Sequence, residues 1–215
     1  MVKKVLLSII FLVCACRLVA SSEPTPDSIV AYSENREYRL TIYPRKMHQI
    51  EWRSSKEKRR FFRGLDTLPN ETVLRILDSI YYIPCHAVLC EISASDTLEI
   101  WNKPLVNYSS PVNAIVSDDG KYVATTGDFL GGNYRHALVV YGEGGEVMVD
   151  YHIEDISPFP MEQYAYSSIG VHWITRWGDV IRFLDNGSIE VSFQNEAGEE
   201  RTREFDIGML RAAVR

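Results

Sequence analysis

The chain has 215 residues, of which 46% are hydrophobic, 24% charged and 11% aromatic. This composition is typical of a soluble globular protein with a sizeable core, and it excludes disorder over most of the length. The formal net charge of −6 at pH 7 argues against a nucleic-acid-binding protein, because binding to phosphates requires a basic face.

The N-terminus has the pattern of an export signal. Lys3 and Lys4 precede an apolar run from Val5 to Ala15 that is too short to remain as a membrane-spanning helix. Small residues before Ser22 predict cleavage after Ser21, which makes residues 1–21 a signal peptide. The segment that follows, residues 22–30, is polar and proline-spaced, and it is predicted to be a tether.

A lipoprotein signal is the second interpretation of the same N-terminus. The letters V-C-A-C resemble a lipobox, and cleavage after residue 15 would make Cys16 the lipid-bearing first residue. That cleavage also removes Lys3 and Lys4 and no acid, so the mature protein becomes more acidic by two charges. Both interpretations predict an exported protein, periplasmic or extracellular, and the second adds a lipid anchor to the membrane.

Most of the remaining chain alternates between runs rich in Val, Ile, Tyr and Thr and turns rich in Gly, Asp and Asn, which is the pattern of strands and hairpins. We expect strands over residues 38–43, 50–53, 86–92, 98–102, 112–116, 122–126, 137–141, 147–152, 180–184, 189–193 and 201–205. Their short lengths and even spacing favour antiparallel hairpins over βαβ units. The predicted fold class is all-β, a partial or small β-propeller-like meander with one packed helix, in a single domain over residues 31–210.

Two helical segments interrupt this pattern. A helical insertion is predicted over residues 66–83, where apolar side chains recur at three-and-four spacing after a polar start and Pro84 ends the run. A shorter helical turn is expected at residues 153–156, before prolines break it. The basic run from Arg53 to Arg63 is interpreted as a solvated loop or strand end, with contact to an anionic surface as the alternative.

Four turns along the chain resemble one another. Acidic or amide-rich turns that begin at Ser33, Ser117, Gly142 and Leu184 are each followed by an alternating strand, and the first interval is twice the last. A period near forty residues is that of a four-stranded propeller blade, which limits the mature chain to about four or five blades. Asp118 and Asp119 are therefore interpreted as hairpin residues, since Asp bonds to its own backbone there and Gly supplies positive φ.

Cys85 and Cys90 lie well inside the mature chain, and an oxidising compartment would permit a disulfide between them. If residues 85–92 form one continuous strand, the two cysteines are about 16 Å apart, which is beyond disulfide reach. A disulfide therefore requires a turn after Pro84. The alternative is two buried thiols that pack as small apolar groups.

Several short segments carry a resemblance to a known group of proteins. They are Trp101–Asn107, Pro111–Asp128, Ala137–Gly145, His152–Ile156 and Ser167–Trp173, with a weaker similarity at Ser33–Pro44. Over roughly residues 85–195 the chain resembles a family of uncharacterised exported bacterial β-propeller-like proteins. Members tend to have an aromatic-rich loop after the acidic residue that matches Asp128, and two aromatic residues where this chain has His172 and Trp173. The resemblance implies a fold and an export route, and it brings no catalytic residues.

The loop from Gly127 to His136 is the best candidate for contact with a ligand. It is longer than a hairpin needs, and it combines an acid, a base and aromatic residues between glycines. The alternative is a structural loop that Asp128 and His136 close by hydrogen bonding. The predicted ligand-binding residues are Asp128, Phe129, Asn133, Tyr134, Arg135, His136, His172 and Trp173.

Two functions remain as alternatives. The first is a non-enzymatic β-scaffold that binds a protein or an envelope polymer at the bacterial cell envelope, touching the membrane only through a lipid anchor. The second is a hydrolase or metal-assisted enzyme centred on Asp128, His136 and His172. No metal site and no cofactor are predicted, because the histidines lack the i, i+2 or i, i+4 spacing that places two ligands on one element.

Overall fold

The computed structural model describes residues 26–47, 51–65, 68–129, 135–167, 170–173 and 180–208. The predicted signal peptide and the predicted lipidation site Cys16 lie outside these ranges. Most of the described chain is antiparallel strand, with few helices, and no sheet closes into a barrel. The predicted fold class, an all-β and partly propeller-like meander, is confirmed.

The first two sheets are four-stranded meanders. The first sheet has the order β1 (Ile29–Tyr32), β2 (Tyr38–Tyr43), β5 (His86–Ile92) and β6 (Thr97–Pro104). The second sheet consists of β7 (Asn113–Val116), β8 (Val123–Thr126), β9 (Leu138–Tyr141) and β10 (Val147–Tyr151), paired in chain order. All of these pairs are antiparallel, so each sheet is the unit from which a propeller blade is built.

The C-terminal strands form a third layer of two sheets. β11 (Ala165–Ser167) pairs with β12 (Gly170–His172), and β13 (Ile181–Phe183), β14 (Ser188–Gln194) and β15 (Glu200–Asp206) form a three-stranded meander. The backbone N–H of Gln194 donates to the carbonyl of Trp173 at 3.0 Å, and the N–H of Ser192 donates to that of Val180 at 2.8 Å. Residues after β12 and before β13 therefore both pair with β14.

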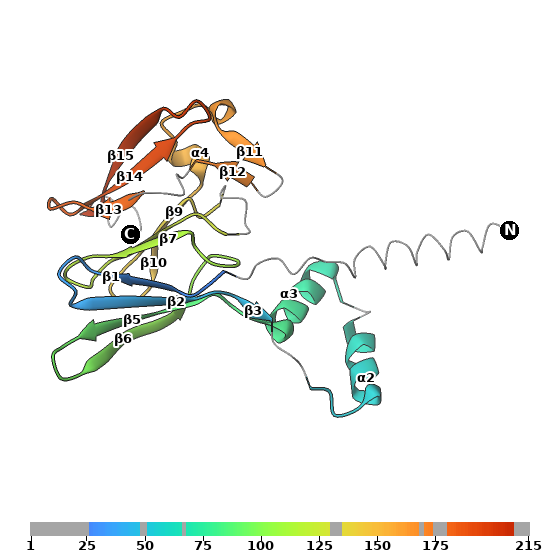
Figure 1. Cartoon of the computed structure of the whole chain (residues 1–215). Coiled ribbons are helices and arrows are strands. Elements are labelled where there is room, and N and C mark those ends of the chain that lie inside the picture. Colours follow the sequence, from blue (N-terminus) through green and yellow to red (C-terminus); the bar gives the residue numbers. More distant parts are fainter. Residues whose placement is uncertain are drawn as a thin grey trace.

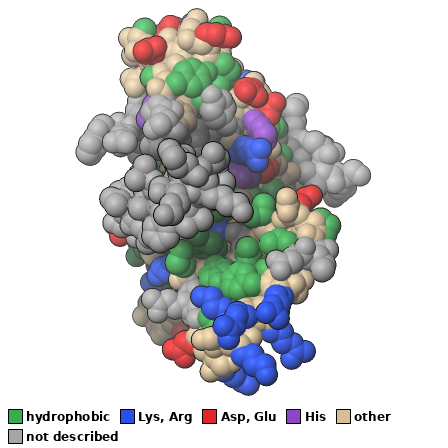
Figure 2. Space-filling view, turned by 90° about the vertical axis from the view of Figure 1, so that its right-hand side faces the viewer, with side chains coloured by type: hydrophobic (Ala, Val, Ile, Leu, Met, Phe, Trp, Pro, Cys, Tyr) green, Lys and Arg blue, Asp and Glu red, His purple; other side chains and the backbone are tan. Residues whose placement is uncertain are grey.

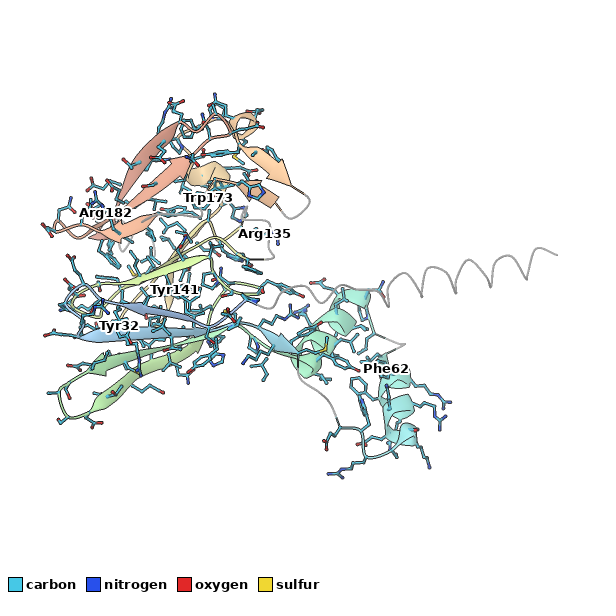
Figure 3. All side chains as sticks on the ribbon, viewed as in Figure 1. Tyr32, Phe62, Arg135, Tyr141, Trp173 and Arg182 are labelled. Atoms are coloured by element: carbon cyan, nitrogen blue, oxygen red, sulfur yellow. The ribbon has the colours of Figure 1, made fainter. Side chains whose placement is uncertain are left out.

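The second sheet is the middle layer of the stack (Figure 1). Its strand β9 is fully buried along its whole length, and its side chains alternate between two cores. Leu138 and Val140 pack with the C-terminal strands, whereas Val139 and Tyr141 pack against the first sheet. Figure 3 places Tyr141 on the side of the first sheet and Trp173 within the C-terminal layer. Burial of each such side chain contributes about 1.5–3 kcal/mol, so β9 holds three layers together.

A helical arm leaves the first sheet between β2 and β5. Its neck is the two-stranded ladder of β3 (Lys46–Met47) and β4 (Tyr82–Ile83), and its body consists of α2 (Ser55–Leu65) and α3 (Asn70–Tyr81). We call residues 46–83 the helical arm. It projects away from the sheets, and Figure 2 shows a group of Lys and Arg side chains beside hydrophobic ones at that end of the molecule. No helix among the described residues combines the length and the apolar content needed to cross a membrane.

The structure corrects three local predictions, two in the helical arm and one at the start of β1. The basic run is helical, not a loop or strand end, because Ser54 Oγ accepts the N–H of Glu57 and the Glu57 carboxylate accepts that of Arg53, in the manner of a capping box. The described residues 51–53 form no strand. The tether predicted over 22–30 ends early, since β1 begins at Ile29, which pairs with Ile42.

The predicted helix within residues 66–83 is confirmed as α3, and the predicted turn at 153–156 is confirmed as α4 (Ile153–Ile156). The prediction that the helix packs on the sheet is wrong, because no residue of α3 belongs to either core cluster of the described chain. In α4 the Asp155 carboxylate accepts the N–H of His152, which satisfies a free donor at the start of the helix. The helical insertion is therefore longer than predicted, because α2 precedes α3 in the same excursion from the sheet.

The described hairpin turns that begin at residues 33, 117, 142, 184 and 195 share one geometry. In each, the N–H of the fourth residue donates to the carbonyl of the first, and the fourth residue has positive φ; these fourth residues are Arg36, Gly120, Gly145, Gly187 and Gly198. A type I turn followed by a residue in the left-handed region has this pattern, and its twist suits antiparallel strands.

The turns at Ser33 and Ser117 match atom by atom. Each serine Oγ donates to the side-chain oxygen two residues on, Asn35 or Asp119, at 2.7 and 2.8 Å, and it accepts the N–H of the tyrosine five residues on at 3.0 Å. The same Asn35 and Asp119 oxygens accept the N–H groups two residues further along. The interpretation of Asp118 and Asp119 as hairpin residues is confirmed.

A comparison of Gly120 and Gly187 distinguishes the free-energy cost of positive φ from that of a steric clash when glycine is replaced by alanine. Gly120 and Gly187 both have positive φ, but a Cβ on Gly120 would overlap the Tyr38 ring, whereas one on Gly187 meets open space. We expect Gly187→Ala to lower the free energy of unfolding by about 1–2 kcal/mol. Gly120→Ala should cost about 1–3 kcal/mol more, because the ring must move. Urea unfolding followed by fluorescence measures both, and equal losses would contradict the packing of Gly120 on Tyr38.

Candidate functional site

Asp128 is a buried anchor for the connection between the first two sheets. Its side chain is 2% exposed, and its two oxygens accept the backbone N–H groups of Tyr108 at 2.9 Å and Ser109 at 3.3 Å. The neighbouring N–H of Phe129 donates to the carbonyl of Ser110 at 2.8 Å, and the Asn107 amide donates to that of Gly127. These contacts tie Asp128 to the connection between the sheets, which is a structural role of the kind that the sequence left as an alternative.

His136, at the other end of the predicted ligand loop, contacts the neighbouring strand β10. Its Nδ1 lies 2.9 Å from a carboxylate oxygen of Asp150 on β10, and its φ of 57° places it in the left-handed region. Phe129 is 39% exposed and Arg135 is exposed. Asn133 and Tyr134 lie outside the described residues. Binding of a ligand by this loop stays a prediction.

The structure separates the two residues predicted after that loop. Trp173 is fully buried and stacks on Phe193 with ring centroids 5.2 Å apart, so its side chain belongs to the core. His172 precedes it on β12 and is exposed. No contact joins Asp128, His136 and His172 to one another among the described residues, and no group of three or more His, Cys, Asp and Glu side chains in this part of the chain is arranged to hold a metal ion.

Cys85 and Cys90 are both free, buried thiols, so of the two alternatives that the sequence left open, the disulfide is contradicted and the pair of buried thiols is confirmed. Cys90 lies within the continuous strand β5, and Cys85 comes just before its first residue. An extended backbone between them leaves no turn that could bring the sulfur atoms together. Burial, with a smaller effect of the Asp128 carboxylate, raises the pKa of the Cys85 thiol to about 12.

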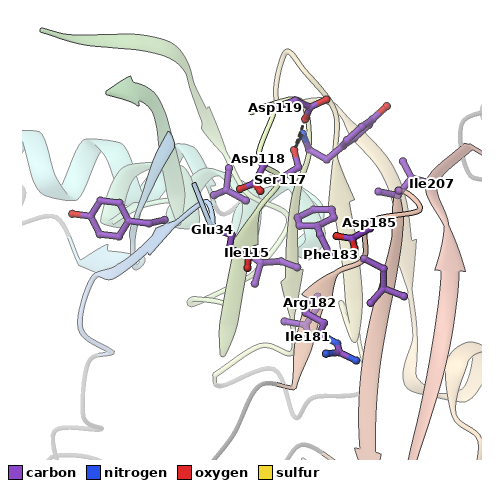
Figure 4. Close-up of a pocket in the computed structure, with 15 residues that line it drawn as sticks. Glu34, Ile115, Ser117, Asp118, Asp119, Ile181, Arg182, Phe183, Asp185 and Ile207 are labelled. Atoms are coloured by element: carbon purple, nitrogen blue, oxygen red, sulfur yellow. Dashed lines mark hydrogen bonds between the residues drawn. The ribbon is translucent and has the colours of Figure 1, made fainter. Parts of the chain in front are cut away.

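A different part of the molecule forms the candidate site: a cleft of about 520 Å³ where three hairpin turns meet. These are the turns between β1 and β2, between β7 and β8, and between β13 and β14, one from each meander. Two of them are joined directly, because the N–H of Asn35 donates to Asp118 Oδ1 at 2.9 Å and the Asn35 amide donates to the Asp118 carbonyl at 2.8 Å. Figure 4 shows the residues that line the cleft.

The cleft has an apolar wall and an acidic rim. The wall includes Ile115, Ile181, Phe183 and Ile207, which come from β7, from β13 and from the chain after β15. The lining carboxylates are those of Glu34, Asp118, Asp119 and Asp185. The one lining cation among the described residues, Arg182, is held by Glu190 at 2.7 Å. The lining is therefore negative on balance.

The four carboxylates differ in the hydrogen bonds and ion pairs that they form within the protein. Burial raises the pKa of Asp119, but hydrogen bonds from Ser117 and Lys121 and the Lys121 charge outweigh it, so this pKa lies below its ordinary value. Asp118 accepts hydrogen bonding from the neighbouring turn. Glu34 and Asp185, in contrast, form no hydrogen bond or ion pair within the described residues, and both are exposed. They are the carboxylates available to a ligand.

Sequence reasoning found these turns but not the cleft that they form. The repeated acidic turns are the signal in the sequence, and their spacing indicates that they are equivalent corners of blades. Three of these turns meet at one place because of how the sheets stack, and the spacing of the turns in the sequence carries no information about this stacking. Comparison of the chain with family models, curated proteins and solved structures finds no match.

Replacement of Asp128 tests its role as an anchor. Asp128→Ala removes a buried carboxylate and leaves the N–H groups of Tyr108 and the buried Ser109 without this acceptor, so we expect the free energy of unfolding to fall by about 2–5 kcal/mol. The exposed Asp185→Ala serves as the control and should stay within about 0.5 kcal/mol of the parent. Urea unfolding gives both values, and an unchanged stability of Asp128→Ala would exclude the anchoring role.

The two thiols are tested by reaction with an aromatic disulfide reagent at pH 8. The protein from Ser22 onward is used, because it retains every described residue and lacks Cys14 and Cys16. We expect almost no reaction in the folded protein, since Cys85 is buried with a pKa of about 12 and Cys90 is also buried. In urea without reductant both thiols should react; a yield well below two per chain would indicate a disulfide.

Proposed function

We propose that the protein is an exported binding scaffold that works at the bacterial cell envelope, and that its cleft takes up a segment of a partner protein with cationic and apolar side chains. The observation that supports this most directly is the pairing of an apolar wall with the unused carboxylates of Glu34 and Asp185. An aliphatic or aromatic side chain fits the wall, and a Lys or Arg beside it reaches the rim.

The size of the cleft suits such a segment. A volume of about 520 Å³ lies within the range of about 300–1,000 Å³ that is usual for small-ligand pockets, so a few side chains fill it. Apolar contact is expected to supply most of the affinity, because exposed ion pairs contribute only about 0.2–1 kcal/mol each. The carboxylates then serve mainly to select the sign of the partner's charge.

The cleft is also held in shape before any ligand arrives. The turns that border it are fixed by their own hydrogen bonds, and those of Asn35 to Asp118 join one sheet to the next. Preorganised binding surfaces lose less conformational entropy on binding than mobile loops do. This rigidity supports a scaffold that recognises a partner without rearrangement.

The proposal is tested with an array of hexapeptides and the protein from Ser22 onward. The peptides combine Leu or Phe with Lys, with Glu or with Ser in otherwise identical sequences. We expect binding to the Lys peptides above the others, and a fall in binding as salt is added. Asp185→Lys should weaken binding to the Lys peptides by about tenfold or more, because it places a cation at the rim.

The matched control is Glu196→Lys, the same charge change in the turn at the other end of β14, away from the cleft lining. It should leave peptide binding unchanged. Equal binding of Lys and Glu peptides, or equal effects of the two substitutions, would refute the cleft as the binding site.

A further inference from the structure

The helical arm is a separate surface on the opposite side of the sheets from the turns that line the cleft (Figure 1). Its neck is fixed to the body by Arg45, whose guanidinium lies between the rings of Tyr82 on β4 and Tyr108 of the inter-sheet connection, 3.8 and 3.7 Å from their centroids. Contacts of this kind contribute about 0.5–2 kcal/mol each. The arm is therefore presented by the body rather than loosely tethered to it.

The exposed side of α2 is strongly basic. Lys56, Lys58, Arg59, Arg60 and Arg63 are all exposed, and Glu57 is the only acid in the helix. None of the five cations forms an ion pair within the described residues. At 3.6 residues per turn, Lys56, Arg59, Arg60 and Arg63 fall on one side of the helix. A protein whose net charge is −6 thus concentrates positive charge on its most projecting element.

The other side of α2 is apolar and aromatic. Phe61 and Phe62 are half-buried there, and Trp52 packs on them with ring centroids 5.3 and 6.2 Å away (Figure 3 labels Phe62). No residue of the arm belongs to either core cluster of the body. On α3, Leu74 is 67% exposed. Leu65 is buried at the end of α2, but Phe61, Phe62 and Leu74 stay partly in water although the protein has two well-buried cores.

We propose that the arm docks the protein on an anionic phospholipid bilayer, with α2 lying in the plane of the headgroups. A helix with a cationic side, an aromatic side and low overall hydrophobicity is the type that binds there, burying its apolar side chains at the acyl boundary. Lys58 falls among the apolar positions, and its long side chain can extend back to the phosphates. A soluble polyanion would satisfy the charge but leave the aromatic side in water, which favours the bilayer.

This inference is independent of the proposed function. The arm shares no residue with the cleft, and its position leaves the cleft facing away from the bilayer. It also differs from the expectation that the membrane is reached only through a lipid on Cys16, because α2 needs no covalent lipid. Membrane docking and partner binding can therefore succeed or fail separately.

Flotation with lipid vesicles tests the proposal. The protein from Ser22 onward is used, because the apolar run before it would itself enter vesicles. We expect binding to vesicles that contain 30% phosphatidylglycerol in phosphatidylcholine, weak or no binding to pure phosphatidylcholine, and loss of binding in high salt. Arg59→Gln combined with Arg63→Gln should weaken binding on the order of 20-fold, as expected for two cations that each gain about fivefold near an anionic surface.

The control is Lys103→Gln combined with Arg203→Gln, which removes the same charge from the exposed strands β6 and β15 and should leave binding unchanged. Circular dichroism confirms that both double variants are folded. Equal binding to both vesicle types, equal effects of the two double variants, or no binding to anionic vesicles would overturn the proposal. Binding to dextran sulfate without binding to anionic vesicles would assign the arm to a polyanion and would also overturn it.

Discussion

Tight chain reversals that require one residue at positive φ are the constraint on which this fold depends. Each meander is built from short strands, and a strand of four residues holds its register only if the turn beside it fixes the pairing. Here the turns do so by joining the first carbonyl to the fourth N–H, with Asn or Asp side chains bonding to the following backbone. Because the same chemistry recurs, several carboxylates of these turns accept hydrogen bonds from backbone N–H groups. Glu34 and Asp185 do not do so within the described chain, and they remain available for other contacts.

The stacking of the sheets converts this local chemistry into surfaces with different properties. The middle sheet is buried on both faces, as the alternation of β9 between the two cores shows, so its neighbours are held in a fixed relation to it. The turns at one end of the stack then meet around an acidic and partly apolar cleft. At the other end the chain leaves the first sheet as a basic helical arm, which joins neither core. The acidic cleft and the basic arm thus lie on opposite sides of the stack.

The polar residues that seemed most suited to chemistry are largely occupied by structure. Asp128 holds the connection between sheets through two backbone N–H groups, His136 pairs with Asp150, and Trp173 fills the core. Buried polar groups must be paired, because an unsatisfied one costs about 1–3 kcal/mol. A long loop with an acid and a base at its ends is therefore compatible in sequence with a ligand site or with a structural loop. The burial of Asp128 favours a structural role for this residue.

The sequence by itself determined most of the strands, the repeated turns and the all-β class, because period-two alternation and the Gly, Asn and Asp chemistry of reversals are local properties. It did not predict β1, β11 or β12. It also determined that Asp118 and Asp119 belong to a hairpin, and that α3 is a helix. Only the tertiary structure decided which turns meet at the cleft and that Cys85 and Cys90 are buried as separate thiols. It also decided that the basic run before α3 is a capped helix that belongs to neither core. These features depend on which faces of different sheets contact one another, and a single sequence records the residues of each face but not the partner that covers it.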